Sequence, residues 1–170
     1  MNKIELAGKV IQIENFNKRS ILIHLLNDFG EYIIKASKES NLSVGMNVHI
    51  YGKLFSLEGN EEPSHLITAE KISESIDKSL NKIVIDFQLE KQTNICGECN
   101  LLLLGNKNCK IYAETDIIHQ KFGQNLRVFG QILPLMIDKN QMMKYTILAN
   151  KIDNIQSLKE KENEQESVWR

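Results

Sequence analysis

Residues 45–57 read GMNVHIYGKLFSL, and residues 123–135 read GQNLRVFGQILPL, so one stretch of the chain recurs 78 residues later. Both copies alternate apolar and polar residues, which is the period of a strand with one buried face. Both also carry an internal glycine, Gly52 in the first copy and Gly130 in the second. Strong strand curvature favours a residue without a side chain. The stretch therefore predicts a long, coiled strand of a small barrel.

The repeat continues further along the chain. After a slip of two residues, the motif Ala-x-Lys-Ile at residues 69–72 recurs at residues 149–152. A period near 78 residues is longer than the units of solenoid proteins. It suits two copies of one small domain within a chain of 170 residues. Because a domain of about 75 residues buries only a modest core, we expect the copies to pack together or the chain to form a homo-oligomer.

Turn signals divide each copy into five short strands. In the first copy, the cluster Asn27–Gly30 is typical of a hairpin turn between two apolar runs. We therefore expect an all-β protein with a first domain over residues 1–76 and a second over residues 80–155. Residues 156–170 are highly charged, which predicts a flexible tail or a short helix.

The first copy resembles a known family in two segments. Residues 41–72 resemble the second half of single-stranded DNA-binding proteins of the oligonucleotide-binding (OB) fold, in which a glycine-led strand ends in a Gly-Arg/Lys-Leu step; here that step is Gly52–Leu54. Residues 2–13 resemble their first strand. The second copy matches less well, because Gln131 stands at the basic position of the step and Phe87 at the position of Gly8.

This resemblance covers most of residues 1–75 and about the second half of residues 79–155. It implies two tandem five-stranded OB barrels that bind single-stranded DNA with little sequence preference, in replication, repair or the transfer of a plasmid or mobile element. It also implies a protein that is not an enzyme. No catalytic triad, phosphate-binding glycine loop or paired-carboxylate motif stands out in the sequence.

Single-strand binders stack bases on exposed rings beside cations. On the fourth strands, alternation places Tyr51 and Lys53 outward, and likewise Arg127 and Phe129. The first hairpin loop adds Phe16 beside two basic residues. The expected nucleic-acid contacts are Tyr32, Lys35, Tyr51, Lys53, Lys110, Tyr112, Arg127 and Phe129. Outward rings could equally form a surface where copies or subunits meet.

The pair Cys96 and Cys99 has the spacing of a zinc-binding turn, and Cys109 with His119 would complete four ligands. The spacing of these further residues matches no familiar zinc pattern, so reduced cysteines beside a tight turn are the favoured interpretation. We therefore expect no metal and no cofactor. His24 lies in an apolar strand, and we expect it to be a hydrogen-bonded buried group.

The formal net charge of −1 leaves a second function open. The chain could be an OB-fold interaction module of a replication, conjugation or secretion assembly that does not touch nucleic acid, and an RNA binder is a weaker alternative. The acidic tail with Trp169 could recruit replication or transfer proteins. No run of 18 apolar residues and no apolar leader is present, so we expect a cytoplasmic protein. The resemblance to single-strand binders implies a bacterial one.

Overall fold

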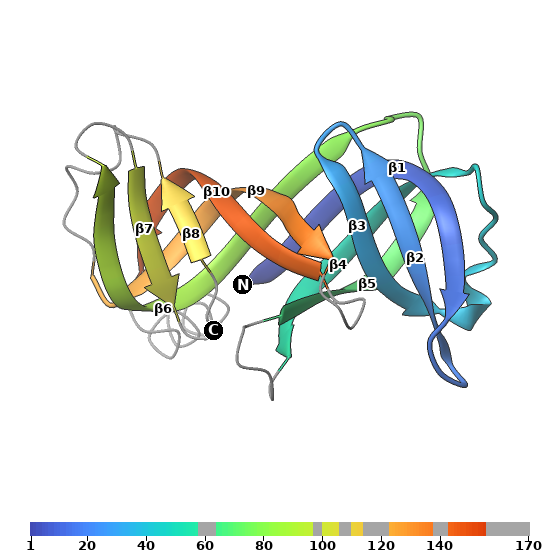
Figure 1. The fold of residues 1–170 in the computed structure, drawn as a ribbon, viewed down its shortest axis with the longest axis horizontal. Helices are drawn as coiled ribbons and strands as arrows, with labels where there is room; N and C mark the ends of the chain where they lie inside the picture. Colours follow the sequence, from blue (N-terminus) through green and yellow to red (C-terminus); the bar gives the residue numbers. More distant parts are fainter. Residues whose placement is uncertain (58–63, 97–99, 106–109, 114–122, 138–142, 156–170) are drawn as a thin grey trace, which may run out of the picture.

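The computed structural model describes residues 1–57, 64–96, 100–105, 110–113, 123–137 and 143–155, and this part of the chain is all-β (Figure 1). The first five strands are β1 (Asn2–Asn15), β2 (Ser20–Asn27), β3 (Gly30–Ser37), β4 (Asn47–Leu57) and β5 (Ser64–Glu74). The other five are β6 (Leu80–Cys96), β7 (Asn100–Gly105), β8 (Lys110–Ala113), β9 (Asn125–Ile137) and β10 (Met143–Asn154). One 3₁₀ turn, η1, covers Lys38–Ser40.

Strands β1 to β5 close into a barrel. Strand β1 pairs antiparallel with both β2 and β4, β2 pairs with β3, and β4 pairs with β5. A short parallel pairing of β3 with β5 completes the circuit. Along β1 and β4 the side chains of Ile4, Leu6, Val48 and Ile50 point inward and are buried. The predicted all-β class and the predicted closed five-stranded barrel are therefore confirmed.

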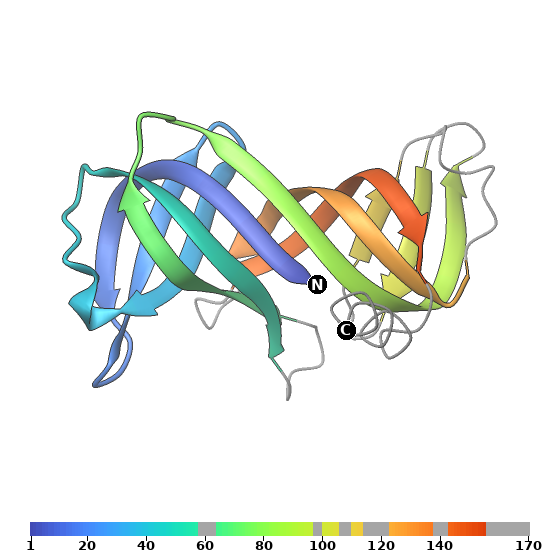
Figure 2. The ribbon, with the colours of Figure 1, turned by 180° about the vertical axis from the view of Figure 1, so that it is seen from behind.

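Strands β6 to β10 pair in the corresponding order. Strand β6 pairs with β7 and β9, β7 pairs with β8, β9 pairs with β10, and β8 runs parallel to β10. Figure 2 shows β1 and β6 side by side, and their antiparallel pairing joins the two groups of strands into one sheet. The register is symmetric about the pair Ile4–Ile83, with Asn2 opposite Ile85 and Leu6 opposite Asn81.

Two asparagines extend the hydrogen-bond ladders β1–β4 and β6–β9 in the same way. The amide of Asn2 donates to the Leu54 carbonyl at 2.8 Å and accepts from the Leu54 N–H at 3.0 Å. The amide of Asn81 makes the same two bonds to Ile132, at 2.8 and 2.9 Å. In both cases a side-chain amide takes the place of a backbone peptide group, because the backbone pairing ends at Ile4–Gly52 and at Ile83–Gly130.

A buried contact joins β3 to the second group of strands. The Tyr32 hydroxyl donates to the Ile132 carbonyl at 2.6 Å and accepts from the Asn81 amide at 3.0 Å. The Tyr32 ring stacks on Tyr145 with ring centroids 5.8 Å apart, and the Tyr145 hydroxyl bonds the backbone of Ile33. Burial raises the pKa of both tyrosine hydroxyls, so both remain neutral hydrogen-bonding groups.

The fold therefore corrects one expected nucleic-acid contact. Tyr32 is 0% exposed, and a ring without accessible surface cannot stack on a base. The alternation of β3 turns Tyr32, Ile34 and Ala36 inward, so the opposite side of this strand is formed by Glu31, Ile33 and Lys35.

Within the described part of the chain, no helix has the length and hydropathy needed to cross a lipid bilayer.

Candidate nucleic-acid interface

Three aromatic rings of the described residues have a lysine ammonium above them. Lys35 Nζ lies 5.5 Å from the centre of the Phe16 ring, Lys71 Nζ lies 5.8 Å from that of Tyr51, and Lys151 Nζ lies 5.2 Å from that of Phe129. These distances are within the range of cation–π attraction. Each pair offers a flat apolar surface next to a positive charge.

The pairs at Tyr51 and Phe129 occupy equivalent places in the two groups of strands. Tyr51 on β4 lies opposite Lys71 on β5, and Phe129 on β9 lies opposite Lys151 on β10. A bulge follows in both strand pairs, between Tyr51 and Gly52 in the first and between Ala149 and Lys151 in the second. The buried neighbours of both rings point into the cores, so the rings stand on the outer face of the joined sheet.

Tyr51 is the more accessible of these two rings. It is 37% exposed, and it stacks on His49 with centroids 4.5 Å apart and an angle of 12° between the planes. Phe129 is half-buried. Stacking by His49 and the nearby ammonium of Lys71 hold the Tyr51 ring in place, so its exposed part is an ordered apolar surface.

The third pair lies at the first hairpin, between β1 and β2, and on the neighbouring strand β3. Phe16 follows β1 and is 39% exposed, and Lys35 stands on the outer face of β3. The Asn17 side chain accepts from the backbone N–H groups of Arg19 and Ser20, at 2.9 and 2.8 Å, and so shapes the turn. Short polar side chains favour such turns because they replace a backbone acceptor.

Two of the expected phosphate contacts already have acidic partners. Lys53 forms an exposed ion pair with Glu70 at 3.1 Å. Arg127 binds Asp86 through two nitrogens, at 2.6 and 2.8 Å, and the Met1 amine reaches the same carboxylate at 2.8 Å. Burial alone would raise the pKa of Asp86, but the bonds from Arg127 and the amine outweigh it and lower that pKa. The charge of Arg127 is thus compensated within the protein.

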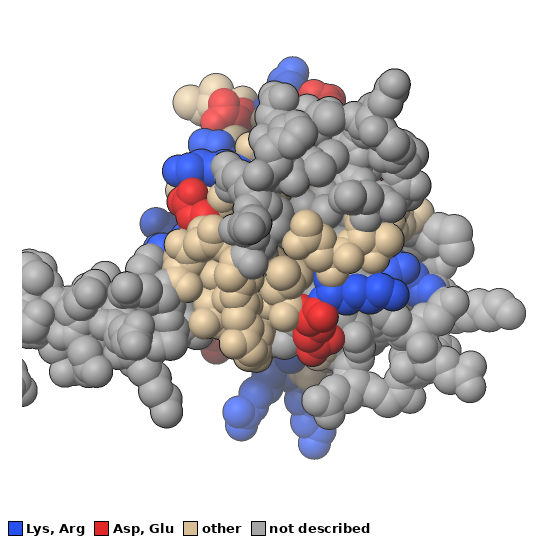
Figure 3. Space-filling view, turned by 90° about the vertical axis from the view of Figure 1, so that its left-hand side faces the viewer, with Lys and Arg blue, Asp and Glu red and all other residues tan. Residues whose placement is uncertain are grey.

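The remaining expected contacts lie on β8. Lys110 is exposed and Tyr112 is half-buried. Figure 3, seen from the end of the molecule formed by β6, β7 and β8, shows basic side chains scattered around the described surface with acidic ones among them. This distribution agrees with the near-neutral net charge of −1.

The cysteine motif falls largely outside the described residues. Cys96 ends β6, while Cys99, Cys109 and His119 lie outside the described part, and the zinc interpretation stays a hypothesis. Within the described ranges, no group of three histidine, cysteine or acidic side chains is arranged to hold a metal ion.

Sequence reasoning did not assign Lys71 and Lys151 to the interface. Their signal was present, since both belong to the recurring Ala-x-Lys-Ile motif. What the sequence lacked was the register that places each lysine opposite its ring. Cross-strand neighbours are decided by strand pairing, which a single sequence does not specify.

Comparison with known proteins supports the fold. No protein-family model and no curated protein matches this sequence. The structure is similar to the single-stranded DNA-binding protein from Thermus aquaticus, with a TM-score of 0.67 and 13% identity over 92% of this chain and 93% of that one. A deletion mutant of that protein gives a TM-score of 0.62 and 14% identity over 92% of this chain and 95% of that one. At such identity the similarity shows the fold, and the expected OB-type barrel is confirmed at that level.

Proposed function

We propose that this chain binds single-stranded DNA with little sequence preference. The observation that carries the proposal is the set of three ring–lysine pairs on outer faces of the strands. Support also comes from the fold, which is that of a single-stranded DNA-binding protein. Stacking of a base on an aromatic ring contributes about 1–3 kcal/mol per base, and it tolerates any sequence because every base has a π-face.

In the proposed complex the rings hold bases and the lysines hold the adjacent phosphates. The contacts are Phe16, Lys35, Tyr51, Lys71, Phe129 and Lys151, and Lys53, Lys110 and Tyr112 would extend them. Tyr32 and Arg127 are left out because the first is buried and the second is paired with Asp86. Binding would serve replication, repair or the transfer of a mobile element.

We also infer that the chain is a tandem duplicate of one OB barrel, over residues 1–76 and 80–155. The corresponding pairing orders support this inference, and so do the symmetric register about Ile4–Ile83 and the equivalent roles of Asn2 and Asn81. Two linked sites on one chain would raise the affinity for a long strand, because binding at the first site raises the effective concentration at the second.

A protein-interaction module is the second candidate function. It is favoured by the net charge of −1 and by the acidic partners of Lys53 and Arg127. In that case Tyr51 and Phe129 would be buried against another protein or a second copy of the chain.

Titration of labelled oligo-dT distinguishes the two candidates. We expect affinity to fall steeply as the salt concentration rises, and the double variant Tyr51→Ala, Phe129→Ala to bind at least about tenfold more weakly because it loses two stacking platforms. The control is Phe55→Ala, which removes a ring that is 45% exposed on β4 and has no lysine above it among the described residues. Undetectable binding at low salt would favour the interaction module, and equal losses in both variants would show that the ring–lysine pairs do not form the binding site.

A further inference from the structure

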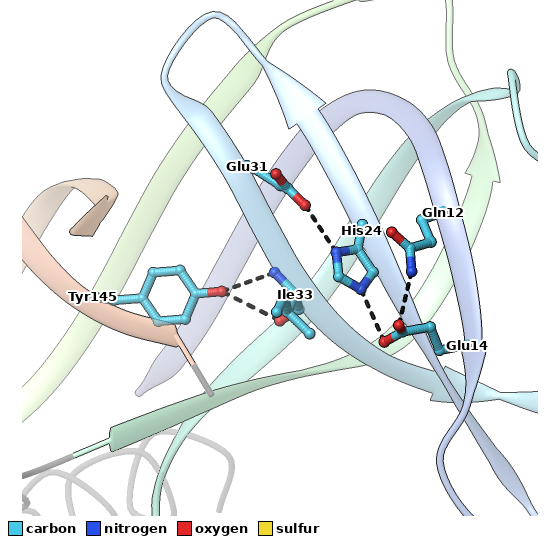
Figure 4. A network of polar contacts seen from close by, with 6 residues as sticks. All are labelled: Gln12, Glu14, His24, Glu31, Ile33 and Tyr145. Atoms are coloured by element: carbon cyan, nitrogen blue, oxygen red, sulfur yellow. Dashed lines mark hydrogen bonds and ion pairs between the residues drawn. The ribbon is translucent and has the colours of Figure 1, made fainter. Parts of the chain in front are cut away.

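A histidine on the first barrel stands between two carboxylates that come from the neighbouring strands. His24 lies on β2, its Nδ1 is 2.8 Å from a carboxylate oxygen of Glu31 on β3, and its Nε2 is 3.1 Å from one of Glu14 on β1 (Figure 4). Gln12 donates to the other oxygen of Glu14 at 2.7 Å. The three strands thus hold a carboxylate–imidazole–carboxylate bridge.

This geometry requires a charged histidine. A neutral imidazole has one N–H and can donate to only one carboxylate, whereas the imidazolium donates from both nitrogens. Burial by itself lowers the pKa of His24, but the hydrogen bonds and charges of Glu31 and Glu14 outweigh it and raise the pKa above 6.5. The bridge therefore carries one positive and two negative charges while His24 is protonated, and two uncompensated negative charges once His24 loses its proton.

The bridge lies beside the Phe16–Lys35 pair. In the paired register, Leu22 on β2 is opposite Glu14 on one side and opposite Lys35 on the other. Glu14 and Lys35 are therefore two strand spacings apart, about 10 Å. That separation is comparable with the Debye length at ~0.1 M salt, so a change of one charge at the bridge alters the potential that a phosphate meets at Lys35.

We propose that His24 is a pH-dependent charge element that sets the affinity of the outer face of β1, β2 and β3 for the phosphates of a single strand. The inference rests on the proposed function and names a regulation of that same site. While His24 is charged, the net charge of the bridge is −1 and Lys35 can attract a phosphate. Loss of the proton makes it −2 and opposes the polyanion.

Other charged groups lie on the strands that pack beside the bridge. Lys9 on β1 and Lys35 on β3 are the basic residues in the adjoining cross-strand rows, and His49 on β4 lies 3.7 Å from Glu5 on β1. From the second group of strands, the Tyr145 hydroxyl is bonded to Ile33, and its pKa is raised by burial. His24 is the only histidine within β1, β2 and β3.

The raised pKa of His24 also makes the free energy of unfolding depend on pH. A histidine whose pKa is raised by folding stabilises the folded state fully below its unfolded pKa of about 6.5, and the contribution is lost as pH rises through the folded pKa. His24→Gln should remove this dependence from the midpoint of urea unfolding.

The binding test compares oligo-dT affinity between about pH 6 and about pH 9 at low salt. We expect at least about a twofold weakening for the unmodified chain, as one charge at about 10 Å in water implies. His24→Gln should bind with the weaker affinity and lose the part of the pH dependence that His24 supplies. Glu39→Gln, which removes an exposed carboxylate on η1, is the control and should keep the full pH dependence.

A second measurement tests the inference in the unmodified chain, so that it does not depend on whether His24→Gln folds. The ring signals of His24 in the unmodified chain, followed by NMR, should titrate above pH 6.5 and move lower in the double variant Glu14→Gln, Glu31→Gln. Binding that persists without pH dependence, or that keeps its pH dependence in His24→Gln, overturns this inference alone. Absence of binding at every pH overturns the proposed function together with it.

Discussion

At the scale of single residues, buried side-chain amides complete the hydrogen bonds of the sheet. Asn81 is 6% exposed, and its amide satisfies both backbone groups of Ile132 and contacts the Tyr32 hydroxyl. Asn2 makes the equivalent pair of bonds to Leu54 at a partly buried site. A buried donor without a partner costs more than an exposed one, because water cannot replace the lost bond.

The two asparagines should therefore respond differently to truncation. We expect Asn81→Ala to lower the free energy of unfolding by about 3 kcal/mol, because the buried N–H of Ile132 loses its acceptor. Asn2→Ala should cost about 1 kcal/mol, since Asn2 itself is half-buried and its two bonds are only partly buried. Urea unfolding of both variants measures this difference, and equal losses would contradict the assignment of burial as the cause.

At the scale of elements, the sharp bend of β4 against β5 depends on a missing side chain. A Cβ at Gly52 would overlap the carbonyl oxygen of Thr68, and one at Gly130 would overlap that of Leu148. Both obstacles are backbone atoms, which cannot move without breaking the ladder. Each bulge also sits next to a ring–lysine pair, so the bend sets the angle at which Tyr51 and Phe129 stand on the outer face.

Alanine at either bulge should thus damage the strand pairing. We expect Gly52→Ala and Gly130→Ala each to destabilise the protein by about 2–3 kcal/mol. Gly123→Ala is the matched control, because the nearest atom to its Cβ would be Asn154 Oδ1 at 3.5 Å, and we expect a change within about 0.5 kcal/mol. Thermal unfolding measures all three, and a neutral Gly52→Ala would show that the strands can part without cost.

At the scale of the whole molecule, the two groups of strands share a sheet, buried hydrogen bonds and an apolar core. The β1–β6 pairing joins them into one sheet, and Tyr32 and Tyr145 bury polar contacts between them. One cluster of buried apolar residues runs through both groups. Each group therefore loses buried surface and hydrogen bonds if the other unfolds.

The chain should unfold as one cooperative unit. We expect a single calorimetric transition whose calorimetric enthalpy equals its van't Hoff enthalpy. Asn81→Ala should lower the midpoint of the whole transition. Two resolved transitions, with only one shifted by Asn81→Ala, would show that the contacts between the groups are too weak to couple them.

The sequence by itself determined the periodic features of this protein. Alternation and turn chemistry are local, so the strands, the curved glycine-containing strand and the all-β class could be predicted from residues 45–57 and their recurrence. The outward position of Tyr51 and Phe129 followed from the same period of two.

Tertiary structure alone decided which side chains meet. Tyr32 was expected to contact bases, yet it is buried, and its ring stacks on Tyr145 while its hydroxyl bonds Ile132 and Asn81 of the other group of strands. Arg127 reads as a free cation until the β6–β9 register places Asp86 beside it. The lysines over the rings and the bridge at His24 have the same origin, because each joins different strands. Strand register and packing between the two groups of strands are non-local, so a single sequence carries no direct record of them.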